Sequence, residues 1–228
     1  MKLQYFYLSY FMIAIMACLL AFLDMQYLSI GFKWLSFFVL SAVYFNLNQE
    51  NDILFYLGIV FSGIAESMMV IGIENFQREV NICFSIYAWL IVFLLKNSVN
   101  KIVFHIKKEK IIPFVISAFL IIYLIFEVLH IISPELKNNI IYSYIFVASF
   151  LSMLFYIGIL YISKHNRRYI WLLFLIISFV SSTLVGSLES LYYQNELIKQ
   201  LVYIIEAASH FFLLKFLITP DKDINYIE

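Results

Sequence analysis

The stretch Phe61-Ser-Gly-Ile-Ala-Glu66-Ser-Met-Met69 lies inside an apolar run, residues 52–73, that is long enough to cross a bilayer. It carries the ionisable side chain of Glu66 at a depth where lipid would otherwise surround the chain. A carboxylate at the centre of a membrane costs about 3 kcal/mol on insertion scales, so such residues usually face a polar interior. The stretch therefore predicts a membrane helix whose glutamate faces a site inside a helical bundle.

The same pattern returns once, further along the chain. Gly186-Ser-Leu-Glu189-Ser190 repeats the glycine, the glutamate and the serine of Gly63-Ile-Ala-Glu66-Ser67. Tyr87 and His210 follow the two glutamates at the same spacing, so the segments after them align without a gap. Two carboxylates in matching contexts indicate parallel repeats in the chain and favour a site that uses both acids.

The composition indicates that lipid is the solvent for most of the chain. Apolar residues make up 64% of the sequence, charged residues 13% and aromatic residues 19%, which is more apolar surface than a soluble core of 228 residues needs. The net charge of zero gives no support for nucleic-acid binding. Cys18 and Cys83 lie in apolar runs far apart in the sequence, which is typical of small apolar fillers rather than of a disulfide or a metal pair.

Apolar windows of about twenty residues follow one another along the sequence. We expect an all-α polytopic membrane protein with eight transmembrane helices, in which residues 1–228 form a single domain because no linker is long enough to separate two. The first apolar run resembles a signal peptide, but it is long enough to span a membrane and we interpret it as an uncleaved helix. The expected helices are residues 5–23, 27–47, 52–73, 80–96, 111–132, 139–163, 169–191 and 197–218.

The distribution of lysine and arginine predicts the orientation of these helices. With eight helices, the two termini and the long loop at residues 96–110 share one side of the membrane, and most basic residues of the chain lie on that side. The other side has only Arg78, Lys137 and Lys199. Because cytoplasmic loops carry the excess of positive charge, we expect both termini in the cytoplasm and a multi-pass protein of the cytoplasmic membrane. The basic loop would also contact anionic lipid head groups.

In this orientation the ionisable residues within the apolar runs cluster by depth, because most of them fall in the outer half of the bilayer. We therefore expect a polar cavity that opens toward the outer side. Two alternatives stay open: residues close to a helix end can reach the interface, and Glu206 and His210, four apart on one helix, can pair with each other. The residues of the expected cluster are Lys33, Glu66, Glu127, His130, Glu189, Glu206 and His210.

Four stretches resemble the YhhN family of membrane proteins, whose characterised members are lysoplasmalogenases. The family has a lysine in helix two, a Phe-Ser-x-x-Gly-Asp stretch in helix three, a Ser-Asp-Ser-Leu-like stretch in helix seven and a Tyr-x-x-Ala-Gln-like pattern in the last helix. The resemblance covers nearly the whole chain in helix count and order, and it implies eight helices with cytoplasmic termini. The matching stretches are Phe32-Lys33-Trp34-Leu35, Phe61-Ser-Gly-Ile-Ala-Glu66, Leu188-Glu189-Ser190-Leu191 and Glu206-Ala-Ala-Ser-His210.

The chain departs from the family pattern at several positions. Glutamate replaces both family aspartates, and Trp34 replaces the proline that usually follows the lysine. Tyr87 stands where many members have histidine, and His210 where many have glutamine. The glutamates keep the acid but move it by one methylene group, which changes the placement of a catalytic carboxyl.

The resemblance implies a lysoplasmalogenase-like hydrolase that cleaves the vinyl-ether bond of a lysophospholipid. This reaction needs one protonated carboxyl and one carboxylate, and two acids in a low-dielectric cavity can divide these roles, as they do in glycosidases. We expect Glu66 and Glu189 to form this acid/base pair, in either order. No cofactor or metal is expected. The residues expected to bind or orient the substrate are Lys33, which would attract its phosphate, together with Tyr87, Glu206 and His210.

Two other functions are considered. A non-catalytic membrane protein of the same fold would bind a lipid or a partner helix and use its glutamates as structural hydrogen-bonding groups. A transporter is less favoured, because Pro113, Pro134 and Pro220 fall at the ends of the expected helices instead of breaking them at mid-membrane. A zinc lipid hydrolase would need several histidines at membrane depth, where the chain has only His130 and His210. Membrane lipids are the expected partners, and the oligomeric state stays open.

Overall fold

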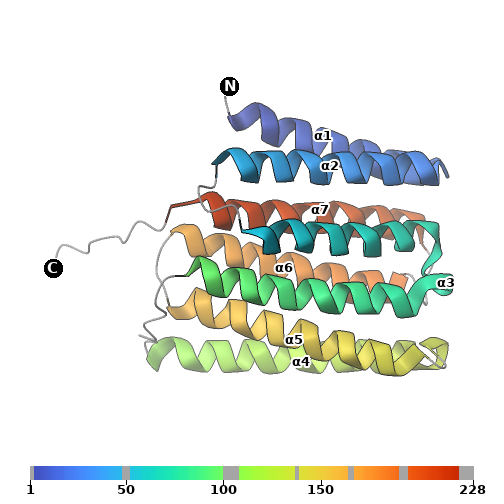
Figure 1. Cartoon of the computed structure of the whole chain (residues 1–228). Helices are drawn as coiled ribbons and strands as arrows, with labels where there is room; N and C mark the ends of the chain where they lie inside the picture. The colour runs from blue at the N-terminus through green and yellow to red at the C-terminus, as the bar shows by residue number, and fades with distance from the viewer. Residues whose placement is uncertain are drawn as a thin grey trace.

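The computed structural model describes residues 3–47, 52–99, 108–136, 139–163, 167–189 and 195–220. Figure 1 shows that the described residues form a bundle of helices lying side by side. Each of its seven helices is long and apolar enough to cross a membrane, so the all-helical fold and its membrane-spanning character agree with the composition. They are α1 (Leu3–Phe22), α2 (Gln26–Leu47), α3 (Ile53–Ser98), α4 (Lys108–Leu136), α5 (Ile140–Ser163), α6 (Arg167–Leu188) and α7 (Glu196–Ile218).

The helix α3 doubles back on itself. Its backbone leaves helical geometry at Gly72, with φ 146° and ψ 108°, and again at Phe76. Figure 1 shows its two arms running in opposite directions. A straight helix of 46 residues would separate its ends by about 69 Å. Instead, the amide of Asn97 donates a hydrogen bond of 3.0 Å to Asp52, the residue that caps the start of α3.

The two arms of α3 replace the separate helices expected at residues 52–73 and 80–96. A tight turn joins them, because Gly72 lacks a Cβ and can adopt a positive φ that other residues rarely adopt. The other boundaries agree with expectation to within a few residues. Pro113 and Pro134 were expected at the ends of a helix, and both lie inside α4, near its two ends.

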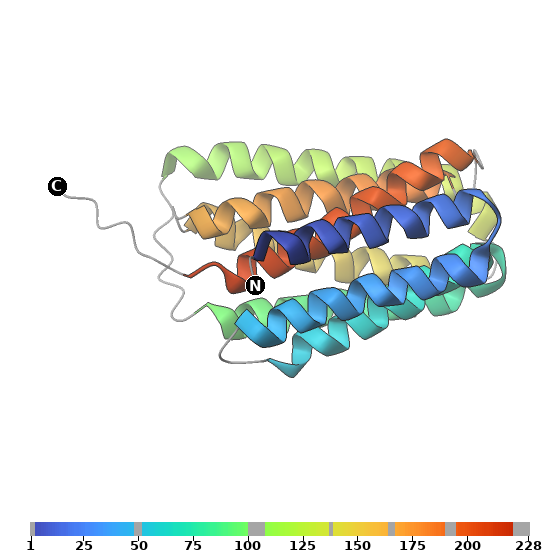
Figure 2. The ribbon, with the colours of Figure 1, turned by 90° about the horizontal axis from the view of Figure 1, so that it is seen from above.

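The reversal of α3 determines at which end of the bundle α1 begins and α7 ends. A simple alternation of seven helices would place the start of α1 and the end of α7 at opposite ends of the bundle. Figures 1 and 2 show both at the same end, together with the start of α3 and its end. The doubling back of α3 accounts for this placement.

The core of the bundle includes side chains from all seven described helices, among them the fully buried Tyr10, Tyr44 and Phe216. The outward face is also apolar: the side chain of Phe38 is 70% exposed and that of Phe119 is 69% exposed. An apolar surface of this extent is expected for a protein that is solvated by lipid.

The α3 hairpin gives a prediction about stability. Alanine at Gly72 would have to adopt a positive φ, so Gly72→Ala should destabilise the protein by about 1–3 kcal/mol. Gly31 is the matched control: it lies within α2, and a Cβ there would meet nothing within 4 Å, so Gly31→Ala should leave stability unchanged or raise it. Thermal unfolding in detergent measures both variants. Equal midpoints would contradict the role given to Gly72.

Candidate functional site

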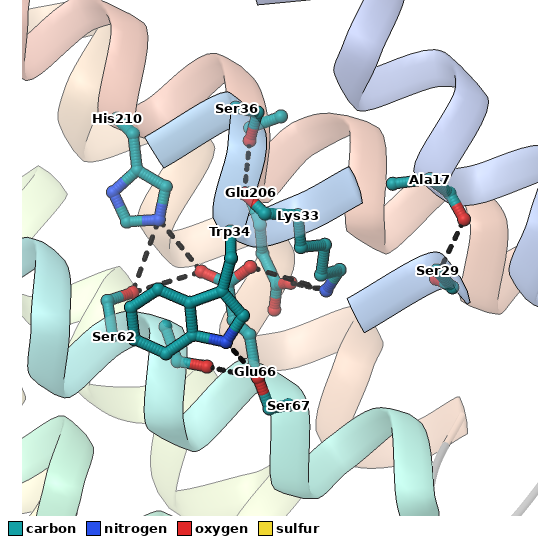
Figure 3. A network of polar contacts seen from close by, with 12 residues as sticks. Ala17, Ser29, Lys33, Trp34, Ser36, Ser62, Glu66, Ser67, Glu206 and His210 are labelled. Carbon is teal, nitrogen blue, oxygen red and sulfur yellow. Dashed lines mark hydrogen bonds and ion pairs between the residues drawn. The ribbon is translucent and has the colours of Figure 1, made fainter. Parts of the chain in front are cut away.

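Lys33 of α2 lies between two buried carboxyl groups. Its Nζ is 3.3 Å from Oε2 of Glu66 on α3 and 4.0 Å from Oε2 of Glu206 on α7. The ammonium also lies over the ring of Tyr203, 3.9 Å from its centroid. Figure 3 shows the three side chains converging from three different helices. One lysine thus links α2, α3 and α7 inside the bundle.

The second oxygen of Glu66 is also bound. Ser62, one helical turn earlier on α3, donates a hydrogen bond of 3.0 Å to Oε1, and Nε2 of His210 lies 2.8 Å from the same atom (Figure 3). Glu66 is 4% exposed and His210 is 2% exposed. A carboxylate that meets three donors is stabilised in its charged form even when buried. Glu66 is therefore held as a fixed anion.

His210 connects Glu66 to Tyr87, on the second arm of α3. The Tyr87 hydroxyl lies 3.1 Å from Nδ1 of His210. With the imidazole neutral and its hydrogen on Nε2, Tyr87 donates to Nδ1 while Nε2 donates to Glu66, and every polar atom in the chain of contacts is satisfied. Phe37 packs edge-on against the imidazole at 5.1 Å, which restrains the plane of the ring.

Two glycines allow the helices to approach closely enough for these contacts. A Cβ on Gly63 would lie 3.0 Å from the ring of Trp34 and 3.2 Å from that of Phe37, both on α2. A Cβ on Gly186 of α6 would lie 3.2 Å from Val202 of α7. Small residues at helix crossings let backbones pack closely in membranes. The glycines of the two similar motifs therefore have the same structural role at two different crossings.

The two acids of the cluster differ in their surroundings. Both oxygens of Glu66 accept hydrogen bonds, whereas Oε2 of Glu206 is buried and has no hydrogen-bond partner among the described residues. With Lys33 as the ammonium, a proton retained on Glu206 or on His210 would make the cluster neutral, which avoids the cost of burying a net charge. Among the described residues, Oε2 of Glu206 thus has the 4.0 Å contact with Lys33 and no hydrogen bond.

A cavity lies against this cluster, between the two arms of α3 and helices α4 to α7. It holds about 1100 Å³ of empty space, its open side included. Glu66, Tyr87, Glu206 and His210 contribute to its lining, and the side chains of α4 and α5 that line it are almost all apolar. Lys33 does not belong to the described lining, so its ammonium acts on the carboxyl groups and not on the cavity. The cavity therefore combines acids with a largely apolar lining.

The structure brings together most of the residues that the sequence assigns to the site, namely Lys33, Glu66, Tyr87, Glu206 and His210.

Glu189 is buried directly after the end of α6 and does not belong to the described lining of the cavity. Glu127 and His130 were expected in the same polar cavity but are exposed on α4 and do not line it. Both lie near the end of α4, where a polar side chain can reach the membrane interface.

Ser62 is the member of the cluster that sequence reasoning did not select. It belongs to the quoted stretch and precedes Glu66 by four residues, so the helical spacing already places both on one face of α3. A serine one helical turn before a charged residue in a membrane helix is therefore the sequence feature that would have identified Ser62. Among the described residues, no three His, Cys, Asp or Glu side chains lie together as metal ligands would.

Comparison of the chain with protein-family models, with curated proteins and with solved structures finds no match. The functional argument therefore depends on the geometry of the Glu66 cluster and its cavity, together with the motif resemblance described above.

The buried ion pair gives a prediction that a double-mutant cycle tests. Lys33→Met and Glu66→Gln should each destabilise the protein by about 3–5 kcal/mol, because each removes the closest ion-pair partner of a charge in an apolar interior. The double variant should lose clearly less than the sum of the two, as measured by thermal unfolding in detergent. The partly exposed pair Glu196–Lys199 is the control, and its loss should cost at most about 1 kcal/mol. Additive losses at Lys33 and Glu66 would contradict the pairing.

Proposed function

We propose that this chain is an integral membrane hydrolase that cleaves the vinyl-ether bond of a lysophospholipid. The observation that carries the proposal is the position of two buried acids, Glu66 and Glu206, in the wall of a largely apolar cavity. The largely apolar lining suits the hydrocarbon chain of a lipid, and the acids suit the chemistry of an acid-labile bond. The motif resemblance to the YhhN family supports the same reaction.

Hydrolysis of a vinyl ether begins with a proton transfer to carbon. The acid protonates the alkenyl carbon that is not attached to oxygen, which leaves an oxocarbenium ion. Water adds to the carbon attached to oxygen, and its extra proton returns the acid to its starting form. The resulting hemiacetal breaks down to a fatty aldehyde and a free glycerol hydroxyl. Acid, carboxylate and water are sufficient for this sequence, as in the related chemistry of glycosidases.

Glu206 suits the role of acid, because its Oε2 has no hydrogen-bond partner among the described residues and the residue lines the cavity. Glu66 suits the role of carboxylate, since it is fixed as an anion and can stabilise the cation and orient the water. The sequence pairs Glu66 with Glu189 instead. The geometry favours Glu206 because Lys33 bridges it to Glu66.

The other residues of the cluster act through Glu66. Lys33 was expected to attract the substrate phosphate, but in this mechanism it positions the two carboxyl groups, because its ammonium points at them. His210 orients Glu66, and Tyr87 orients His210. These are positioning roles, since none of the three residues needs to touch the reacting atoms.

An assay of the purified protein in detergent tests the reaction. The protein is offered a lysoplasmalogen and the matching acyl lysolipid, and fatty aldehyde is measured by mass spectrometry. We expect aldehyde from the lysoplasmalogen only, and a loss of about 100-fold to 10,000-fold in Glu66→Gln and in Glu206→Gln. Glu189→Gln distinguishes the two pairings: it should stay active if Glu206 is the acid. Glu127→Gln, exposed on α4, is the control for an acid outside the site.

A non-catalytic protein that binds a lipid or a partner helix is the second candidate. The observation that favours it is that both oxygens of Glu66 are already bonded to protein groups, as in a structural ion pair. Under this function the folded wild-type protein would turn over neither lipid. No turnover of either lipid by the folded wild-type protein would reject the hydrolase.

We propose further that both arms of α3 cross the membrane, giving eight crossings with both termini on the cytoplasmic side of the cell membrane. The support is the reversal of α3 and the excess of basic residues at the end of the bundle where α1 begins.

Cysteine labelling tests this topology. In a background in which Cys18 and Cys83 are replaced by alanine, Asn75→Cys in the α3 turn should react with a membrane-impermeant thiol reagent added outside intact cells. Thr219→Cys, directly after α7, should react only once the membrane is opened. Labelling of both positions from the same side would exclude eight crossings.

A further inference from the structure

The cavity at Glu66 has a second polar region, at the end of the bundle where α3 turns. Gln77 and Asn81 of the second arm of α3 line the cavity there, together with Ser143 in the first turn of α5. Figure 1 shows the turn of α3 and the start of α5 at the same end of the bundle. The proposed hydrolase reaction uses none of these three side chains, so they call for an explanation of their own.

The two amide side chains each have one polar atom that protein groups leave unused. Nδ2 of Asn81 donates to Oγ of Ser143 at 3.0 Å, and Nδ2 of Asn139 donates to Oε1 of Gln77 at 3.2 Å. Within the described ranges, Nε2 of Gln77 and Oδ1 of Asn81 make no hydrogen bond. Gln77 is nevertheless buried, with only 7% of its surface exposed. Because a buried polar atom without a partner is costly, this region is suited to a polar ligand.

The chemistry of this region fits an uncharged hydroxyl group. Gln77 and Asn81 lie one helical turn apart on the same face of α3, and they present one N–H donor and one C=O acceptor to the cavity. An alcohol both donates and accepts a hydrogen bond, so one hydroxyl can satisfy both atoms. A phosphate is usually bound by cationic side chains, and no lysine or arginine belongs to the described lining.

The distance from this region to the two acids matches a lysophospholipid. Tyr87 lies at the level of the acids, because its hydroxyl contacts His210, which contacts Glu66. Asn81 precedes Tyr87 by a rise of about 9 Å along the helix. In a vinyl-ether lysolipid, the carbon that is protonated and the oxygen of the free glycerol hydroxyl are about 6 Å apart when the bonds between them are extended. A hydrogen bond of about 3 Å to Asn81 accounts for the remainder.

We propose that Gln77 and Asn81 recognise the free glycerol hydroxyl of the lysophospholipid. Nε2 of Gln77 donates to the hydroxyl oxygen, and the hydroxyl donates its hydrogen to Oδ1 of Asn81, while Ser143 and Asn139 hold the two amides in position. An ester at this position has no hydrogen to donate, so a lipid with a second acyl chain would leave Oδ1 of Asn81 unpaired. The inference rests on the proposed function for the identity of the ligand, and it adds the residues that select it.

Binding of two lipids that the proposed reaction cannot cleave tests this site. One is a saturated 1-alkyl lysophosphatidylethanolamine, and the other is the same lipid with hydrogen in place of the free hydroxyl. Neither has a double bond to protonate, so their retention by the purified full chain can be measured by native mass spectrometry without turnover. From an equal mixture, the wild type should retain the hydroxyl lipid about tenfold better, as expected for two hydrogen bonds in a buried site.

Two variants remove the amides one at a time. Gln77→Met and Asn81→Leu nearly conserve side-chain volume, and each should bring the retention of the two lipids close to equal. Because the positions are changed separately, one variant still tests the site if the other does not fold. Asn97→Leu is the matched control: Asn97 is exposed on the same arm of α3 and bonds to Asp52 at the opposite end of the bundle, so the preference should stay intact.

Cleavage of a lysoplasmalogen is measured separately, so the two proposals can fail independently. Equal retention of the two lipids by the wild type, or an unchanged preference in both amide variants, would overturn the hydroxyl site even if the lysoplasmalogen is cleaved. Water would then be the partner of the two amides. A preference that both variants lose, without any cleavage by the wild type, would reject the hydrolase and support the hydroxyl site in a lipid-binding protein.

Discussion

The ion pair between Lys33 and Glu66 requires α2 and α3 to meet in one register, and the arrangement of the site depends on this constraint. Neither charge is tolerable alone in an apolar bundle, whereas the pair satisfies both. A rotation of α3 by a single residue would turn Glu66 by about 100° around the helix and break its contacts with Lys33 and His210 together. The pair therefore selects one packing of helices whose apolar faces would otherwise allow several.

The repeated motif acquires a physical meaning from this packing. Its glycines, Gly63 and Gly186, allow close crossings of α3 with α2 and of α6 with α7. The residues that follow the two glutamates at equal spacing, Tyr87 and His210, meet in a hydrogen bond. Equivalent positions of the repeat thus face each other at the centre of the bundle. Of the two glutamates, Glu66 forms the ion pair with Lys33 at 3.3 Å, and Glu189 is buried directly after the end of α6.

The sequence predicts the membrane-spanning segments well and their rotations poorly, for one reason. Apolar runs can be recognised in the sequence because lipid and protein core are both apolar. For the same reason a membrane helix has no polar face, so the sequence does not show which side of the helix points inward. Lys33, Glu66, Tyr87 and His210 were identifiable because polar side chains in such runs are conspicuous. The choice between Glu189 and Glu206 depended on rotation and on the crossing of α7 with α2, which periodicity does not report. The tight turn at Gly72 was hidden because one glycine among apolar residues is not distinctive.

The α3 hairpin has a consequence for how the protein is made. The insertion machinery receives α2 before α3, and α1 contains no acidic residue that could neutralise Lys33. The lysine first meets its counter-ion when the first arm of α3 arrives, so α1, α2 and α3 form the smallest segment that can leave the insertion machinery without an isolated charge. Glu206 and His210 come with α7, the last helix. The cluster is therefore complete only once α7 has joined the bundle.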